Sequence, residues 1–402
     1  MDCLLKKRLD FPALQRKVHG YPLVYLDSAA TALKPKSVIE AVANFDRQLG
    51  TTVHRGVYTT VQEATTLYQE ARTKVQQFLG AKHFEEIIFT RGTTSSLNLL
   101  AHSFIPAFCK PADVILLSEI EHHSNLIPWQ MAAQAYGVQL RFIPVNDQGE
   151  LEFDGLIDEK VKLVSLAHIS NVLGTLHPVE TLIQQAHAIG AYVCLDGAQS
   201  APHLPIHLQQ LDVDFFACSG HKLYGPTGVG ILYGKKQLLE RMSPVEGGGD
   251  MLELATLQDY TPNQLPYKFE AGTPMIGQVI GLGAAIDYLQ EIGMVKIAEY
   301  ESFLLAYATE ALNKVKGLRI LGTAAHKGAI ISFVVEGVHP LDIATMLDCR
   351  GFALRSGHHC SQPTMQRFGV SATCRISFGV YNTQEDIDQF VYHLKSILEI
   401  FQ

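Results

Sequence analysis

Strand-like and helix-like segments alternate through the middle of the chain, and this alternation restricts the possible folds more than any other feature. Helical segments separate apolar runs that are predicted to be buried strands at 86–90, 113–118, 161–168, 191–196 and 215–218. Strands joined through crossover helices form a parallel sheet that is covered on both faces. The segment 228–234 follows the last strand closely enough to return as an antiparallel neighbour. The sequence therefore predicts an α/β fold with a mainly parallel sheet.

The pattern changes in the last quarter of the chain. At 402 residues the protein exceeds what one hydrophobic core usually supports. Long helices are expected at 276–291 and 294–316, and a compact α+β unit then follows with elements at 329–335, 340–350, 352–355, 374–378 and 384–400. We therefore expect a large domain of residues 21–292 and a smaller α+β domain formed by residues 1–20 and 293–402.

Composition excludes several classes of protein. The net charge is −8, and no basic run is longer than Lys6-Lys7-Arg8, which argues against nucleic acid or an anionic membrane as a partner. Seven scattered cysteines without a CxxC pair, no signal-peptide core and no apolar stretch of membrane-spanning length predict a reduced, cytoplasmic protein. Most of its thiols are expected to act as small buried hydrophobic side chains.

One lysine follows the apolar strand at 215–218 in an unusual context. The stretch Ser219-Gly-His221-Lys222 leads into a loop with glycines at 225 and 228. Glycines let the backbone approach a ligand closely, and hydroxyl, imidazole and amide donors bind phosphate. This pattern predicts an amine held against a phosphorylated, aldehyde-bearing cofactor. The alternative is a chain that simply reaches the surface.

Other strands also end in polar residues. The strand ending at Thr90 runs into Arg91-Gly-Thr-Thr at the start of a helix, which predicts an anion site, although an ordinary helix cap has the same composition. Neither GxGxxG nor GxxxxGK[ST] is present, which argues against dinucleotides and nucleoside triphosphates. Asp196 closes a buried strand, where a carboxylate needs a cation or proton donor unless it serves as a structural cap.

Two adjacent histidines, His122 and His123, follow the strand at 113–118, at the sheet edge where α/β folds bind ligands. Adjacent residues point apart, so they form a poor metal pair. We therefore expect no metal site. A metal hydrolase using His122, His123, His358, His359 and Cys360 is an alternative, but these residues lack a suitably spaced ligand pair. Ala29 and Ala30 leave room for a ligand near the backbone, but a tight packing corner would also use such small residues.

Cys360 differs from the other six cysteines because it lies in a polar loop that contains glycine. Neighbouring His and Arg side chains could hold its thiol as a thiolate below the usual pKa, which predicts a nucleophile. An exposed thiol without a function is the alternative. Arg355 and Arg375 could clamp a carboxylate or merely pair with acidic surface residues.

The motifs together resemble the class II cysteine desulfurases of the SufS/CsdA type, in the class V aminotransferase family of fold type I pyridoxal-phosphate enzymes. The resemblance extends from Leu26-Asp-Ser-Ala-Ala to Tyr381-Asn382. The motifs that carry it occur in the order Arg91-Gly-Thr-Thr, Glu121-His-His, Ser170-Asn-Val, Asp196-Gly-Ala-Gln, Ser219-Gly-His-Lys, Ala271-Gly-Thr-Pro and Arg355-Ser-Gly-His-His-Cys. It implies a seven-stranded sheet in the large domain, pyridoxal 5'-phosphate as cofactor and a homodimer.

The resemblance also implies roles for individual residues. Lys222 would form the Schiff base with the cofactor, Asp196 would pair with the pyridinium nitrogen, His122 would stack on the ring and Gln199 would contact the phenolic oxygen. The implied phosphate-binding residues are Thr93, Thr94, Ser219, His221 and Thr273. The implied substrate-binding residues are Asn171, Arg375, Arg355, Ala29 and Ala30. Thr273 and Arg55 could act within one chain or across the dimer.

The implied reaction converts L-cysteine to L-alanine. Lys222 would move the Cα proton, Cys360 would take the sulfur as a persulfide, and His122 would assist protonation of the product. An acceptor protein of the SufE, CsdE or SufU type would then receive the sulfur for iron–sulfur cluster assembly or other sulfur trafficking. A selenocysteine lyase acting on L-selenocysteine, or another pyridoxal-phosphate enzyme of the family, is the nearest alternative. A non-catalytic sulfur relay would need the cofactor residues to be missing.

Overall fold

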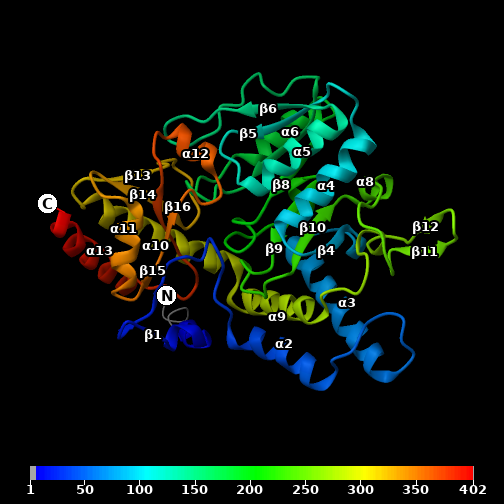
Figure 1. Ribbon diagram of the computed structural model, residues 1–402, viewed down its shortest axis with the longest axis horizontal. Coiled ribbons are helices and arrows are strands. Elements are labelled where there is room, and N and C mark those ends of the chain that lie inside the picture. The colour runs from blue at the N-terminus through cyan, green and yellow to red at the C-terminus, as the bar shows by residue number, and fades with distance from the viewer. Residues whose placement is uncertain (1–5, 402) are drawn as a thin grey trace.

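The computed structural model describes residues 6–401 (Figure 1). Its two main sheets have seven and four strands, and helices surround both. Residues 1–5 lie outside the described part of the chain. The structure therefore bears on the segment 1–20 and on the N-terminal signal region only from residue 6 onward. Within residues 6–401, no helix is long and apolar enough to cross a membrane.

The seven-stranded sheet is mainly parallel, as predicted. Its strands lie in the order β4, β10, β9, β8, β7, β5, β6, and only β10 runs antiparallel to its two neighbours. Their bounds are β4 Ile87–Thr90, β5 Val114–Ser118, β6 Gln139–Ile143, β7 Val161–Ala167, β8 Tyr192–Asp196, β9 Phe215–Ser219 and β10 Gly230–Gly234.

Side chains of these strands alternate between two hydrophobic cores because successive residues of a strand point to opposite faces. In β5, Ile115 and Leu117 join the core that contains α4 Thr93–Phe108, α5 Ile127–Tyr136 and α8 Lys236–Arg241. Val114 and Leu116 join the other core, which contains α3 Thr59–Leu79, α6 Val179–Ala188 and α9 Ile276–Ile292. Both faces are buried, which explains the nearly continuous apolar runs in the sequence.

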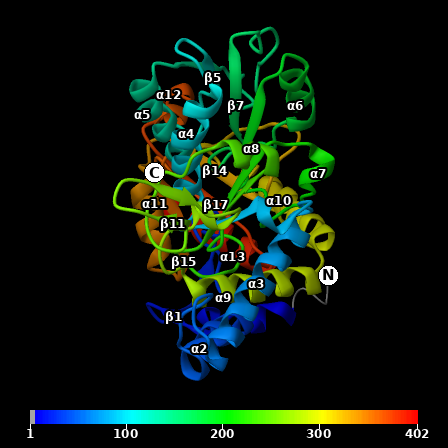
Figure 2. The ribbon, with the colours of Figure 1, turned by 90° about the vertical axis from the view of Figure 1, so that its right-hand side faces the viewer.

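The helix at 61–79 predicted from its spacing is α3, and Gly80 ends it in the left-handed conformation with φ of 64°. Figures 1 and 2 show α3 and α2 Lys36–Gln48 packed along α9 on one side of the molecule. The short helix α7 Leu208–Leu211 precedes β9.

The second sheet lies in the C-terminal part and is antiparallel, with strand order β13, β14, β17, β16. Its strands are β13 Leu318–Leu321, β14 Ile330–Val335, β16 Arg355–Gly357 and β17 Thr373–Ser377. The helices of this part are α10 Met294–Asn313, α11 Pro340–Asp348, α12 Gln362–Arg367 and α13 Gln384–Leu398. Thr383 and Asp386 form the predicted capping box of α13. The N-terminal chain contributes to this part, since β3 Val24–Tyr25 pairs in parallel with β15 Phe352–Ala353.

Some predicted boundaries were wrong. Helix α4 continues to Phe108 rather than ending near residue 103, with Pro106 inside it. The single strand expected at 352–355 is divided between β15 and β16, which belong to different sheets. The hairpin β11 Leu252–Ala255 and β12 Tyr260–Pro262 lies between two stretches, 246–250 and 262–272, that are irregular by composition, and it was not predicted. A short hairpin, β1 Lys17–Val18 with β2 Tyr21–Pro22, was also not predicted.

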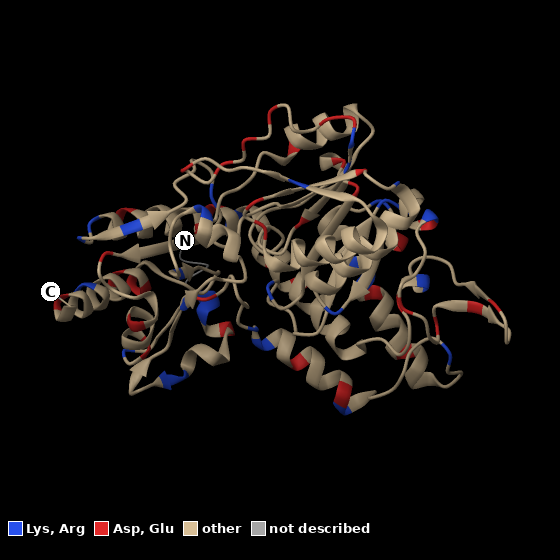
Figure 3. Ribbon diagram, turned by 45° about the horizontal axis from the view of Figure 1, so that its top comes forward, with Lys and Arg blue, Asp and Glu red and all other residues tan. Residues whose placement is uncertain are grey.

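Figure 3 shows Lys and Arg interspersed with Asp and Glu along the helices and loops of both parts. This distribution agrees with the net charge of −8 and the absence of long basic runs in the sequence. The apolar strands of the large sheet occupy the interior, so the polar residues at their C-terminal ends are the ones that need a structural or chemical explanation.

Candidate active site

The carboxyl ends of β5, β7, β8 and β9 and the start of α4 surround a cavity of about 210 Å³. In parallel sheets this edge is where ligands bind. The predicted site residues that line this cavity are Ala29, Ala30, Thr93, Thr94, His122, Asn171, Asp196, Gln199, Ser219, His221, Lys222, Arg355, Cys360 and Arg375. Of the residues assigned to the site from the sequence, only Thr273 does not line it.

Lys222 lies in the wall of this cavity, just after β9. Its amine makes no hydrogen bond or ion pair with any residue in the described range 6–401, although Asp196 is close enough to act on it electrostatically. Removal from water lowers its pKa to about 8, and Asp196 opposes this effect. A primary amine with a lowered pKa is a good nucleophile toward an aldehyde. Its environment therefore fits the sequence prediction.

The polar side-chain atoms of Asp196 and Gln199 indicate whether the cavity suits a pyridoxal ring. Burial raises the pKa of Asp196, while the Ala198 N–H donating to Oδ1 (2.9 Å) and the charge of Lys222 oppose the rise. Oδ2 has no partner in the part of the chain that the structure describes. Gln199 Nε2 donates to the Ala29 carbonyl (2.8 Å), and its buried Oε1 is likewise without a described partner. A carboxylate oxygen and a buried amide oxygen without described partners, on two residues that line the cavity, fit a cofactor that offers a ring N–H and polar substituents.

His122 is held neutral with a defined tautomer. Its Nδ1 accepts a hydrogen bond from the Ser124 N–H (3.0 Å), so the proton resides on Nε2. Burial, aided by the charge of Lys222, lowers its pKa to about 3. The ring is therefore suited to stack on a planar group and to donate from Nε2 rather than to carry a charge.

The residues predicted to bind an anion lie at the start of α4 and at the end of β9. Ser219 Oγ accepts from the Thr93 N–H (2.8 Å) and lies 2.7 Å from Thr93 Oγ1, while Thr94 Oγ1 lies 2.6 Å from Ser124 Oγ. Burial, then the charge of Lys222, lowers the pKa of His221 to about 4. These groups offer hydroxyl and imidazole donors to an anion at a helix N-terminus.

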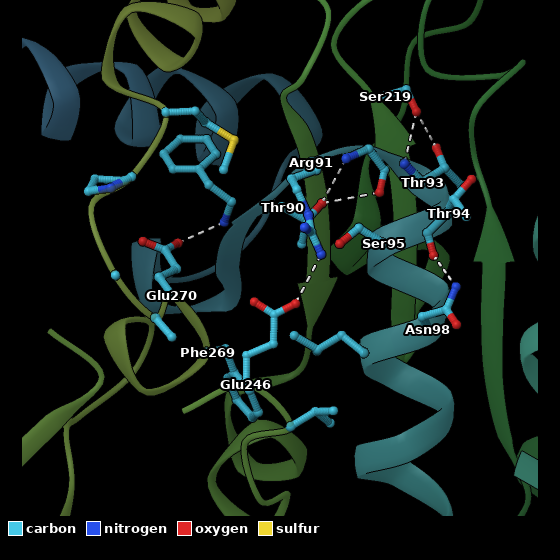
Figure 4. A pocket seen from close by; sticks show the side chains of 18 of the residues that line it. Thr90, Arg91, Thr93, Thr94, Ser95, Asn98, Ser219, Glu246, Phe269 and Glu270 are labelled. Carbon is cyan, nitrogen blue, oxygen red and sulfur yellow. Dashed lines mark hydrogen bonds and ion pairs between the residues drawn. The ribbon is translucent and has the colours of Figure 1, made fainter. Parts of the chain in front are cut away.

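A second, larger cavity of about 770 Å³ adjoins this anion site and shares Thr93, Thr94, Ser219 and His221 with it. Figure 4 shows Ser219 beside Thr93 and shows Arg91 directed toward Glu246, with which it forms an ion pair of 3.0 Å.

The predicted role of Thr273 as a phosphate ligand, within one chain or across a dimer, stays a prediction. Within this chain Thr273 lines the larger cavity and not the one that contains Lys222. The reason is the anchoring of Glu270, which accepts hydrogen bonds from the buried Arg72 (2.7 and 2.8 Å) and from the Phe89 N–H (2.7 Å). These bonds hold the following segment at the side of β4. Arg55 is also outside the smaller cavity and pairs with Asp250 at 2.6 Å.

The two arginines come from paired strands of the small sheet. Arg375 in β17 is buried, donates to the Asn171 carbonyl (3.0 Å) and to Asp27 Oδ1 (3.0 Å), and its Nε has no partner within the described chain. Arg355 in β16 donates from Nε to Asp27 Oδ2 (3.2 Å) and remains partly exposed. Asn171 also donates from Nδ2 to the His359 carbonyl (2.8 Å).

Cys360 is exposed, in the loop between β16 and α12, and both His359 (φ 53°) and Cys360 (φ 55°) adopt the left-handed conformation. The His123 N–H donates to the Cys360 carbonyl (2.7 Å), and Ser361 Oγ donates to the Glu121 carbonyl (3.0 Å). The loop of the small sheet is thereby attached to the segment that carries His122.

Cys360 is not the only exposed cysteine, because Cys349 after α11 is also exposed. The sequence distinguishes Cys360 by its polar loop with glycine, and exposure alone does not separate it from Cys349. What separates the two thiols is their position, since Cys360 lines the cavity and Cys349 does not. Within the described residues, no group of three His, Cys, Asp or Glu side chains has an arrangement that could hold a metal ion.

Sequence reasoning assigned no role to Asp27 or to Glu121. Glu121 is buried beneath the site and accepts from Asn125 Nδ2 (2.7 Å) and the Ala167 N–H (2.9 Å), and burial raises its pKa to about 7. Asp27 directly follows an apolar segment, as Asp196 ends one, and Glu121 lies three residues after the end of β5. An acidic residue at or shortly after the end of an apolar segment is the signal by which the sequence could have identified them.

Comparisons with known proteins agree with the geometry. The family model described as "Aminotransferase class-V" matches residues 24–390. A probable cysteine desulfurase of Halalkalibacterium halodurans is 49% identical over 394 residues, covering 97% of both chains, and a cysteine desulfurase of Pectobacterium atrosepticum is 47% identical with the same coverage.

Solved structures give the same result. The cysteine desulfurase CsdA of Escherichia coli superposes with a TM-score of 0.92 at 41% identity and covers 99% of each chain. The cysteine desulfurase of Thermococcus onnurineus superposes with a TM-score of 0.93 at 39% identity and covers 98% of each chain. The predicted fold is confirmed, and the chain belongs to the class V aminotransferase family, within its class II cysteine desulfurases, which are pyridoxal-phosphate enzymes.

Proposed function

We propose that this enzyme removes sulfur from L-cysteine, leaving L-alanine, and receives that sulfur on Cys360. The observation that carries the proposal is the meeting of Lys222 and Cys360 in one cavity, although they come from different sheets. An amine that can hold the cofactor and a thiol that can accept sulfur are the two groups that this reaction requires.

Lys222 and Asp196 would hold the cofactor, with the start of α4, Ser219 and His221 around its phosphate. When bound, pyridoxal phosphate supplies an electron sink that makes the substrate Cα proton removable. Lys222 is the base for that proton, because its pKa of about 8 makes the free amine available near neutral pH. His122, with its proton on Nε2, would donate toward the reacting substrate from the ring face.

Sulfur transfer is a displacement between two sulfur atoms. The Cys360 thiolate attacks the substrate sulfur, an S–S bond forms and the substrate Cβ–S bond breaks. The electron pair of that bond stays on Cβ, which gains a proton and becomes the methyl group of alanine. Cys360 then carries a persulfide, and its exposure supports transfer of the outer sulfur to another protein. Arg375, Asn171 and Arg355 would orient the substrate carboxylate beside Ala29 and Ala30.

Further proposals concern partners and organisation. We infer a sulfur-acceptor protein of the SufE, CsdE or SufU type, a homodimer with Thr273 and Arg55 acting within one chain or across the interface, and a cytoplasmic location. The six cysteines of the described chain are free thiols, which supports a reducing compartment. We also propose that residues 21–292 form one domain and that residues 1–20 with 293–402 form the other. The antiparallel sheet and α10 to α13 all lie beyond residue 292, which supports it.

The test combines cofactor trapping with sulfur mapping. Borohydride reduction of the yellow holoenzyme should attach the cofactor to the peptide containing Lys222, and L-cysteine should add one sulfur to the peptide containing Cys360. Cys349→Ser is the matched control, because Cys349 is exposed but lies outside the cavity. Colourless protein, cofactor on another lysine, or sulfur on Cys349 would contradict the proposal.

A further inference from the structure

Two arginines face each other directly at the mouth of the active-site cavity. Arg355 in β16 and Arg375 in β17 are register partners across an antiparallel pair. Like charges directly opposite each other destabilise such a pair. The Arg375 side chain is 2% exposed, so water cannot screen its charge effectively. The pair of arginines therefore needs a nearby negative charge to stabilise it.

Asp27 supplies that charge from a distant part of the sequence. Its Oδ1 accepts from Arg375 at 3.0 Å and its Oδ2 accepts from Arg355 at 3.2 Å, so one carboxylate bridges both guanidinium groups. The backbone fixes its location, because Ser377 N–H donates to the Leu26 carbonyl (2.8 Å) and Asp27 forms a parallel bridge with Ser377. Burial lowers the pKa of Arg375, and Asp27 acts in the opposite direction.

The bridge does not use all the donors of the arginines. Arg375 Nε is buried and has no partner among residues 6–401. The terminal nitrogens of Arg355 make no hydrogen bond within that same range. Both side chains line the cavity. Donors therefore remain for an incoming carboxylate while Asp27 keeps its two contacts.

We propose that Asp27 is a positioning and specificity-determining residue that fixes the two arginines and sets their combined charge to that of a monocarboxylate site. Two arginines and one aspartate leave a single positive charge, which matches the one carboxylate of cysteine or alanine. A second positive charge would favour an amino acid with an additional carboxylate. The inference rests on the proposed function, in which these arginines orient the substrate.

The test is a charge series measured by binding. The holoenzyme is titrated calorimetrically with L-alanine and with L-aspartate, and the ratio of their dissociation constants is compared among wild type, Asp27→Asn, Arg355→Gln and the double variant. Asp27→Asn raises the triad to two positive charges, Arg355→Gln lowers it to zero, and the double variant restores one. Asp158→Asn is the control, because it breaks an exposed Arg141–Asp158 pair of 2.9 Å away from the cavity.

We expect Asp27→Asn to shift the ratio toward L-aspartate by about tenfold, Arg355→Gln to shift it the other way, and the double variant to return near wild type. L-Alanine should still bind the double variant more weakly than wild type, because Arg375 has lost its positioning contact. If Asp27→Asn does not fold, the shift in the ratio of dissociation constants for Arg355→Gln tests the proposal.

Ratios that do not change across the folded variants would overturn the role of Asp27. If the wild type binds both amino acids but does not desulfurate L-cysteine, the proposed function fails while the ratios still decide the role of Asp27. If the wild type binds neither amino acid, both proposals fail.

Discussion

The lowered pKa of Lys222 predicts how the apoenzyme takes up its cofactor. Only the neutral amine can attack the aldehyde, so the rate of imine formation should follow the neutral fraction of Lys222. Removal from water lowers its pKa to about 8, against an ordinary value of 10.5. The rate of cofactor uptake should therefore increase as the pH rises and level off above about pH 8.

The structure gives the size of the effect. At pH 7 a lysine with a pKa of about 8 is roughly 10% neutral, whereas an ordinary lysine is about 0.03% neutral. The buried position should therefore raise the rate at pH 7 by about 300-fold relative to an exposed lysine of equal nucleophilicity. Asp196 raises the pKa of Lys222, so Asp196→Asn should move the midpoint to lower pH.

The assay is stopped-flow absorbance of apoenzyme mixed with pyridoxal phosphate between pH 6 and 10. Nα-acetyl-lysine under the same conditions corrects for titration of the cofactor itself, and Lys222→Ala shows that the signal comes from this amine. A midpoint near 10 would refute the claim that the cavity removes Lys222 from water. A midpoint that rises in Asp196→Asn would refute the assigned sign of the Asp196 interaction.

The remaining predictions concern sulfur transfer and stability. Cys360→Ala should lower alanine formation from L-cysteine by at least about 100-fold; unchanged turnover would contradict its role, and retained activity on L-selenocysteine would identify a lyase. Arg72→Met should destabilise the protein by about 3–5 kcal/mol in urea unfolding, because it leaves Glu270 buried and unpaired, and Arg72→Met/Glu270→Gln should recover part of the loss. Burial lowers the pKa of His168 to about 4 and of His177 to about 3, so each histidine should cost about 1–2 kcal/mol of stability as the pH falls from 6.5 to 5, and His177→Gln should halve the total loss in pH-dependent unfolding.

Much of the site was predictable because parallel strands deliver their C-terminal residues to one edge. Asp196 ends β8 and Lys222 follows β9, and these strands are neighbours in the sheet, so sequence order already placed the two residues close together. Cys360 could be predicted as a reactive residue from its polar loop. Its place in the same cavity followed only from the family resemblance, because the packing of one sheet against another is not local information.

The placements that the sequence did not reveal have the same physical origin. Thr273 belongs to a motif of the resemblance, but the buried pair of Arg72 and Glu270 directs its segment into the adjoining cavity. Asp27 received no role because its partners lie more than 300 residues away. Only the register of β16 with β17 brings Arg355 and Arg375 together around it.

The adjacent histidines His122 and His123 connect the segment after β5 to the loop of the small sheet that carries Cys360. The two histidines are poorly spaced as a metal pair because neighbouring side chains point apart. In the structure they accordingly have different contacts. His122 presents its ring to the cavity, while His123 donates its N–H to the Cys360 carbonyl (2.7 Å) and accepts from the Gln362 N–H at Nε2 (3.2 Å). Any displacement of this segment would therefore move the proton donor and the sulfur acceptor together. His122 and Cys360 thus belong to one hydrogen-bonded unit, although the two residues come from different sheets.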